Sequence, residues 1–149
     1  MEKIKVGILT LSDGREYLHN EHKDMLLAYQ NDIAKALEET GEFQVVQGRQ
    51  AINTNMAAKE EAVRLQENGV EATIFNYAIW CYPQFTAVAQ NFAPGPYLLF
   101  CNLHPSECGM VGMMAAAGTL DQLNVKYHRL WGSIREENVK KQLISYLKA

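Results

Sequence analysis

The sequence predicts an α/β protein in which helices cover both faces of a parallel five-stranded sheet. Short apolar runs alternate five times with longer segments of helical character along the 149 residues. Some of these runs, such as Val6-Gly7-Ile8-Leu9 and Tyr97-Leu98-Leu99-Phe100, show no polar alternation, which is typical of strands buried on both sides. Strands that alternate with helices imply right-handed crossovers and a three-layer, flavodoxin-like (Rossmann-like) arrangement. Five units suggest the strand order 2-1-3-4-5.

The first two units follow from apolar periodicity and from glycine stops. Their segments are strand 4–11, helix 16–40, strand 43–46 and helix 55–68. The first helix is predicted by apolar residues mostly three, four or seven apart, namely Leu18, Met25, Leu26, Tyr29, Ile33 and Leu37. Gly41 and Gly69 follow the two helices and are natural stops.

The remaining three units repeat the same order. Their segments are strand 72–77, helix 83–92, strand 97–101, helix 109–123, strand 126–131 and helix 136–148. The short helix at 83–92 leads into Ala93-Pro94-Gly95-Pro96, whose composition predicts a loop. The helix at 109–123 is rich in glycine and alanine, which lets a backbone or a second domain approach closely.

Composition excludes several classes of protein. A length of 149 residues predicts a single domain, and a net charge of −3 argues against nucleic acid as the main partner, because phosphates need a basic face. No apolar stretch approaches the ~18 residues of a membrane span, and the first residues enter a strand-like run at once, so no secretory leader is expected. Three cysteines without Cys-x-x-Cys spacing fit free thiols in a reducing cytosol, so we expect a cytoplasmic protein.

The fold directs attention to the loops beyond the carboxyl ends of the strands, at 12–15, 77–82, 102–109 and 132–133. The first, Ser12-Asp13-Gly14-Arg15, has too few glycines for a phosphate cradle, and the other strand ends lack the acid and lysine of a phosphoacceptor site. Two interpretations remain. Asp13 could cap a turn with Arg15 solvated, or Arg15 could be presented at the sheet edge to grip hydroxyls or an anion.

Aromatic residues follow the third strand. Trp80, with Tyr77 and Tyr82 on either side, would offer ring faces to the C–H surface of a sugar and polar tips to its hydroxyls. The alternative is that Trp80 and Phe85 close one end of the core or face another subunit. The position at a predicted ligand edge leaves both interpretations open.

The remaining polar residues do not form a recognisable catalytic set. The loop at 102–109 holds His104, Glu107 and Cys108, but their spacing disfavours a metal site, and a Cys–His nucleophile pair lacks an orienting third group. His19 and His22 lie three apart on the first helix, where a solvated helix face is favoured over a metal site. The residues alone therefore lead to a binding or interaction domain of α/β class.

Four features in sequence order carry a resemblance to a known family. They are Asp13-Gly14-Arg15, Trp80-Cys81-Tyr82, the stretch from Asn102 through Gly109-Met110-Val111 into an alanine-rich helix, and Trp131-Gly132. With this order and spacing, essentially the whole chain resembles the N-terminal domain of the L-fucose isomerase family, the ketol isomerases related to L-arabinose isomerase.

The resemblance implies an aldose–ketose isomerase, an intramolecular oxidoreductase that moves hydrogen between C1 and C2 through an enediol with a divalent metal, usually manganese. The metal ligands and the acid–base carboxylates belong to later domains of such enzymes, so neither is expected in this chain. The N-terminal domain would cap the active site of a neighbouring subunit in an oligomer. Arg15 and Trp80 would contact the sugar, Asp13 would hold the loop and Gly14 would allow its turn, with Tyr82 as a further substrate-binding candidate.

Chains of this family are several times longer than 149 residues. We therefore expect either a domain of a longer enzyme, inactive on its own, or a free-standing sugar-binding or protein-interaction module that keeps the fold without the chemistry. A reading frame that continues beyond Ala149 would favour the first hypothesis, and a stop codon there would favour the second. The preferred sugar and the oligomer size are not encoded in any pattern that we find.

Overall fold

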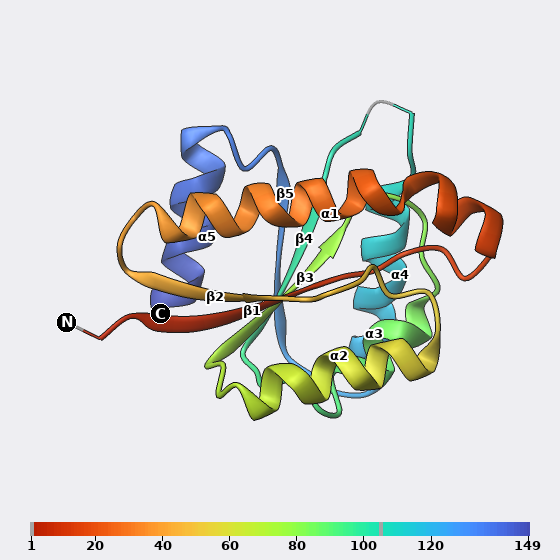
Figure 1. Ribbon diagram of the computed structural model, residues 1–149, viewed down its shortest axis with the longest axis horizontal. Helices are drawn as coiled ribbons and strands as arrows, with labels where there is room; N and C mark the ends of the chain where they lie inside the picture. The colour runs from red at the N-terminus through yellow and green to blue at the C-terminus, as the bar shows by residue number, and fades with distance from the viewer. Residues whose placement is uncertain (1, 105) are drawn as a thin grey trace.

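The sheet of the computed structural model is parallel throughout and has the predicted order β2-β1-β3-β4-β5 (Figure 1). The structure describes residues 2–104 and 106–149. The strands are β1 (Ile4–Thr10), β2 (Phe43–Gln47), β3 (Ala72–Tyr77), β4 (Tyr97–Asn102) and β5 (Tyr127–Gly132). Because all five run the same way, the loops that follow them meet at one edge of the sheet.

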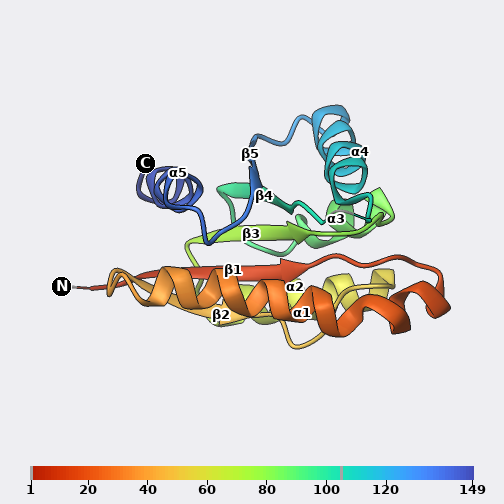
Figure 2. The ribbon, with the colours of Figure 1, turned by 90° about the horizontal axis from the view of Figure 1, so that it is seen from above.

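Helices form the two outer layers, above and below the sheet in Figure 1, which confirms the three-layer prediction, and Figure 2 looks down on the sheet from one of these layers. One face is covered by α1 (Glu16–Glu38) and α5 (Glu137–Lys148), and the other by α2 (Asn55–Glu67), α3 (Pro83–Ala89) and α4 (Gly109–Gln122). Helix α3 ends three residues before the predicted end at 92, because the chain tightens into turns that begin with a hydrogen bond from the Asn91 N–H to the Val88 carbonyl (3.2 Å). Among the described residues, no helix is both long and apolar enough to cross a membrane.

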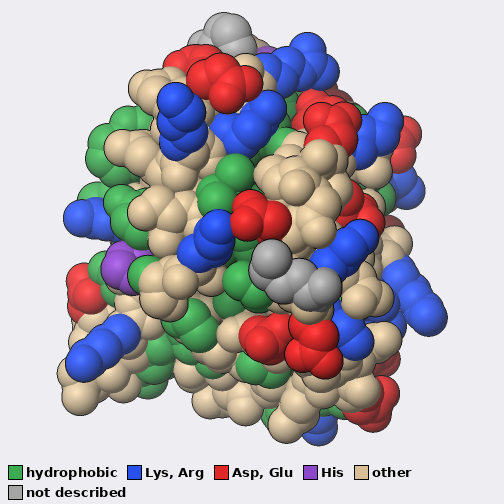
Figure 3. All heavy atoms as spheres, turned by 90° about the vertical axis from the view of Figure 1, so that its left-hand side faces the viewer, with side chains coloured by type: hydrophobic (Ala, Val, Ile, Leu, Met, Phe, Trp, Pro, Cys, Tyr) green, Lys and Arg blue, Asp and Glu red, His purple; other side chains and the backbone are tan. Residues whose placement is uncertain are grey.

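Both chain ends lie at the edge where the strands begin (Figure 1). Helix α5 returns to this edge, where Lys148 Nζ donates a hydrogen bond to Glu42 Oε1 (2.7 Å) just before β2. Figure 3 shows this edge face-on, with basic and acidic side chains interspersed over it. The candidate loops therefore lie at the opposite edge from the termini.

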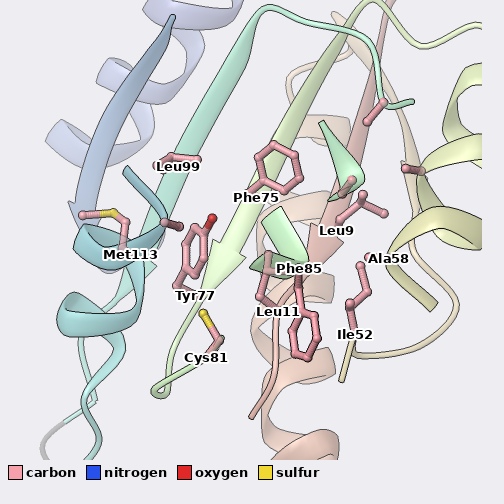
Figure 4. Packing of buried hydrophobic residues seen from close by; sticks show 14 of the residues in the cluster. Leu9, Leu11, Ile52, Ala58, Phe75, Tyr77, Cys81, Phe85, Leu99 and Met113 are labelled. Carbon is pink, nitrogen blue, oxygen red and sulfur yellow. The ribbon is translucent and has the colours of Figure 1, made fainter. Parts of the chain in front are cut away.

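The sheet divides the apolar core into two clusters. Phe75, Leu99 and Met113 belong to the larger cluster, between the sheet and helices α2, α3 and α4 (Figure 4). The second cluster lies under α1 and α5 and includes Ile8 and Phe100. All six residues of β3 are buried, as expected for a central strand covered on both sides.

Strand β5 departs from the prediction of a sheet covered on both faces. Leu130 is buried, but Arg129 is exposed and 52% of the Trp131 surface is accessible. The reason lies in α4, which packs chiefly on β4. Two of its glycines allow it to contact the backbone of the loop after β3, and this places the helix away from β5. The helix therefore leaves the edge strand partly bare.

Candidate functional site

The loop after β1 is organised by the carboxylate of Asp13. Asp13 Oδ1 accepts hydrogen bonds from the Arg15 backbone N–H (2.9 Å) and from Arg15 Nε (3.0 Å), and Oδ2 accepts one from Arg15 Nη2 (2.8 Å). The Asp13 side chain is 3% exposed, whereas that of Arg15 is 48% exposed. The two interpretations of this loop are therefore compatible, since Asp13 holds the turn and the arginine still reaches solvent.

The same ion pair sets the protonation of Asp13. Burial alone raises the pKa of this carboxyl group, but the hydrogen bonds and the positive charge of Arg15 outweigh burial, so the pKa lies below its ordinary value of 3.8. Asp13 is therefore ionised at neutral pH, and it fixes the direction in which the planar guanidinium points.

Gly14, the glycine expected to allow this turn, lies against an aromatic ring. Its backbone is not in the left-handed region, which among the described glycines is adopted by Gly41, Gly69 and Gly132. A Cβ at Gly14 would instead collide with the ring of Tyr82, which stacks on Phe85 with 5.6 Å between ring centroids. Glycine is required here because an aromatic ring lies against the backbone, not because the turn demands a positive φ.

Three loops meet around a small hollow, which we call the Arg15–Trp80 pocket. Its volume is about 180 Å³, and it is lined by Asp13, Arg15, Leu18, His22, Ile79, Trp80, Glu107 and Cys108. The structure thus brings together Arg15, Trp80 and Asp13, three of the residues that the sequence singled out. Gly14 and Tyr82 lie behind this wall, where Tyr82 packs against the loop instead of lining the pocket.

The position of Trp80 depends on the start of α4. A Cβ at Gly109 would lie 2.8 Å from the Ala78 carbonyl carbon, and a Cβ at Gly112 would lie 2.8 Å from the Ile79 carbonyl oxygen. These glycines let the helix pack directly against the backbone of the loop that carries Trp80, which confirms the close approach expected of them. Gly118 has open space around it and plays no such part.

His22 corrects the prediction of a solvated helix face. Its side chain is 14% exposed, Nδ1 donates to the Leu18 carbonyl (2.9 Å), and Nε2 lies 2.9 Å from Glu107 Oε1. Burial lowers the pKa of His22, but the hydrogen bonds with Leu18 and Glu107 outweigh it, so the pKa is raised above the ordinary 6.5. The spacing of Arg15, Leu18 and His22, three and four apart, could have indicated that they share one face of α1.

The side chain of His19 also makes a hydrogen bond within the protein. Its Nδ1 shares a hydrogen bond with Ser12 Oγ (2.9 Å), and burial together with the charge of Lys23 lowers its pKa. His104 lies in a local turn, where its Nδ1 accepts a hydrogen bond from the Ser106 N–H (3.2 Å). Neither histidine lines the Arg15–Trp80 pocket.

A buried polar ladder runs beneath the carboxyl edge, and its one trace in the sequence is that three strands end in polar residues. Asn102 Nδ2 donates to Asn76 Oδ1, Asn76 Nδ2 donates to Thr10 Oγ1 (3.0 Å), and Thr10 Oγ1 donates to Gln30 Oε1 (2.7 Å). These four side chains are at most 3% exposed. The ladder joins β4, β3 and β1 to α1, so it holds the strand ends from which the pocket loops continue.

Metal-binding clusters and reactive thiols are two further kinds of site to consider among the described residues. Among residues 2–104 and 106–149, no three histidine, cysteine or acidic side chains gather in a way that could hold a metal ion. Burial raises the pKa of the Cys81 thiol, and it raises that of Cys101 to about 11, so both are protonated at neutral pH. The residues of the pocket can donate hydrogen bonds, stack on a ring and supply charge.

A larger hollow of about 570 Å³ lies away from these loops, between the end of α4 and the start of β5. It is lined by residues such as Tyr97, Asp121 and Tyr127, and the Tyr127 hydroxyl donates to Asp121 Oδ1 (2.9 Å). It contains none of the sequence-predicted site residues. We place the candidate site at the smaller hollow because three loops converge there at the carboxyl edge.

The family model described as "L-fucose isomerase, first N-terminal domain" matches residues 3–149. No curated protein matches the chain.

Proposed function

Because the chain belongs to the L-fucose isomerase family, as its first N-terminal domain, we propose that it caps the active site of an aldose–ketose isomerase and supplies contacts to the sugar. The observation that carries this proposal is the convergence of Arg15 and Trp80 on one pocket from separate loops. A guanidinium beside an aromatic face suits a ligand that has hydroxyl groups on one side and C–H groups on the other.

Each residue has a defined part in the proposed contact. Asp13 holds Nε and Nη2 of Arg15, which leaves the Nη1 side of the fork to meet sugar hydroxyls. Trp80 is partly buried and offers the remainder of its surface to the C–H face of the sugar ring. Gly14 and Tyr82 support the loop from behind, so we assign Tyr82 to packing of the site and no longer to direct contact.

The divalent metal of the reaction, manganese in our proposal, would be held by residues outside this chain. Among the described residues, no three histidine, cysteine or acidic side chains lie close enough together to bind it. When bound, the metal would polarise the oxygens of the substrate. The part played by this domain is to bind, orient and cover the sugar.

Such a role requires a partner that carries the catalytic residues, either further domains or a neighbouring subunit of a homo-oligomer. Exposed apolar side chains fit this requirement, since Leu103, Val111, Met114 and Trp131 are each about half exposed. Three free cysteines are compatible with the proposed cytoplasmic location.

The test uses the complete isomerase that contains this domain, with L-fucose as the first substrate. We expect Arg15→Ala and Trp80→Ala to raise KM or lower kcat/KM while the protein stays folded. The corresponding loss of binding free energy should be about 1–3 kcal/mol per lost contact. Arg49→Ala is the matched control, because Arg49 is exposed and does not line the pocket. Unchanged kinetics in both pocket variants would reject the capping role.

The isolated 149-residue chain provides a second test. We expect it to show no aldose–ketose turnover with manganese. Measurable turnover by the pure chain would contradict the proposal, because the catalytic residues would then have to lie within it.

A further inference from the structure

One wall of the Arg15–Trp80 pocket is linked to helix α1 by an ion pair. Glu107 and Cys108 form that wall, and they belong to the turn at 106–108 that leads into α4. Glu107 lies 85 residues from His22 in sequence, yet its carboxylate is 2.9 Å from the imidazole. Among the residues that the structure describes, this is the only ion pair between α1 and the turn.

The hydrogen bonds of His22 determine how many protons its ring must carry. Nδ1 faces the Leu18 carbonyl oxygen, which only accepts, so Nδ1 bears a proton. Nε2 faces the Glu107 carboxylate at 2.9 Å, and that separation is favourable only if a proton lies between the two atoms. An ionised Glu107 therefore pairs with a doubly protonated, positively charged His22.

Loss of one proton reverses this interaction. The lone pair of a neutral Nε2 would face the lone pairs of the carboxylate, and the contact would become repulsive instead of attractive. The pair is also shielded, since the two side chains are 14% and 26% exposed, so solvent screens it less than it would a surface pair. The contact with α1 therefore stabilises the position of the turn when His22 is doubly protonated and no longer does so when His22 is neutral.

We propose that His22 and Glu107 are a positioning pair, which holds the turn at 106–108 against α1 and so sets the width of the Arg15–Trp80 pocket for the sugar. This inference rests on the proposed function for its ligand, but the holding of the turn can be tested without one. Neither residue is a catalytic residue.

Several charged or titratable groups surround His22. They are Asp13 and Arg15 of the loop after β1, Glu21 on α1, and Glu107 and Cys108 of the turn. Asp13 and Arg15 are paired with each other, so their charges largely offset at the imidazole. Glu21 and Glu107 both favour the charged imidazole. The pair is therefore complete below pH 6.5 and weakens as pH rises through the higher pKa of the folded state.

The first experiment follows the 15N-labelled chain by NMR between pH 5 and 9. In the wild type we expect the amides of Ser106, Glu107 and Cys108 to shift with the same midpoint as the His22 ring nitrogens. In Glu107→Gln we expect the His22 midpoint to fall, and the amides of residues 107 and 108 to exchange with water several times faster. His22→Gln should abolish the shared titration.

His128→Gln is the control, because His128 stacks on Tyr146 of α5 (4.7 Å between centroids) and lies outside the pocket. It should leave the titration of the turn unchanged. If the amides of the turn exchange at the same rate in the wild type and in Glu107→Gln, the pair does not hold the turn and the inference is overturned.

The second experiment measures kinetics in the complete isomerase. We expect Glu107→Gln to raise KM for L-fucose roughly three- to tenfold with kcat nearly unchanged. We also expect the KM of the wild type to rise above the His22 midpoint and this rise to be absent in Glu107→Gln. If Arg15→Ala raises KM and Glu107→Gln does not, the inference fails and the proposed function stands. If Arg15→Ala, Trp80→Ala and Glu107→Gln all leave KM and kcat/KM unchanged, both are overturned.

Discussion

The two edges of the sheet treat polar side chains in opposite ways. At the edge where the strands begin, charged groups lie in solvent, as for Lys148 and Glu42, whose side chains are 48% and 45% exposed (Figure 3). Beneath the loops of the carboxyl edge, by contrast, buried polar groups satisfy one another in the ladder of Thr10, Asn76 and Asn102.

The charged side chains of the first edge favour solubility, whereas the buried polar groups of the second hold the loops above them in position. A solvated ion pair contributes little and tolerates change, whereas a buried polar group is costly unless every partner is present. A fold that concentrates buried polar groups under one set of loops has a precise base there for ligand contacts. The experiments below compare the two edges, beginning with the largest expected effect.

Removal of the middle of the ladder should be the most damaging change. Asn76→Ala leaves Thr10 Oγ1 without its donor and leaves Asn102 Nδ2 with only its long contact to the Tyr77 carbonyl (3.4 Å). We therefore expect a loss of about 2–4 kcal/mol in the free energy of unfolding, measured in urea. Gln44→Ala, an exposed amide on β2, is the control and should cost far less. A loss below about 1 kcal/mol for Asn76→Ala would show that the ladder is not a rigid base.

The close approach of α4 offers a matched pair of substitutions. Gly112→Ala places a methyl group 2.8 Å from the Ile79 carbonyl oxygen and 3.1 Å from the Cys81 nitrogen, so the helix must shift at a cost of about 1–3 kcal/mol. Gly118→Ala meets nothing within 4 Å and should stabilise the helix by up to about 1 kcal/mol. Thermal unfolding of both variants measures the contrast, and equal effects would contradict the packing described here.

The loop after β1 should show a pH-dependent effect of intermediate size. Asp13→Asn removes the charge that pairs with Arg15, and we expect a loss of about 1–2 kcal/mol at pH 7. Because the folded-state pKa of Asp13 is lowered, its contribution is present above pH 3.8 and disappears as pH falls through the lower folded value. The difference between wild type and variant should therefore shrink below pH 3.8, and a constant difference down to pH 2.5 would argue against the ion pair.

The opposite edge should be the most tolerant. Lys148→Gln breaks the ion pair with Glu42, yet we expect less than about 0.5 kcal/mol of destabilisation, and that small effect should vanish in high salt. Denaturant titration in low and high salt measures this. A loss comparable to that of Asn76→Ala would remove the distinction between the two edges.

The fold could be predicted from the sequence because each unit carries local signals. Apolar runs, helical periodicity and stops such as Gly41 and Gly69 act over a few residues, and the strand order followed from the number of units. The covering of β5 was predicted less well, since it depends on where α4 is drawn by Gly109 and Gly112 in three dimensions.

The site was predicted only in part. The placement of Arg15, Trp80 and Asp13 near one another follows from the rule that loops after parallel strands share an edge. The contact between His22 and Glu107 could not be seen, because it joins residues 85 apart through the directions of their side chains. The ladder was missed for the same reason, as Asn76 and Asn102 are unremarkable until the strands lie side by side.

The position of the chain ends has a consequence for how a longer protein could be built around this domain. Polypeptide attached after Ala149 starts at the edge opposite the Arg15–Trp80 pocket (Figure 1). To reach that pocket it must first cover the length of α1, about 35 Å at 1.5 Å per residue. A short linker (the tether) would keep a following domain away from the Arg15–Trp80 pocket of the same chain, and that pocket would then be accessible to a neighbouring molecule. If the domain caps an active site as we propose, this layout favours exchange of caps between subunits, and the length of the tether decides which active site each cap covers.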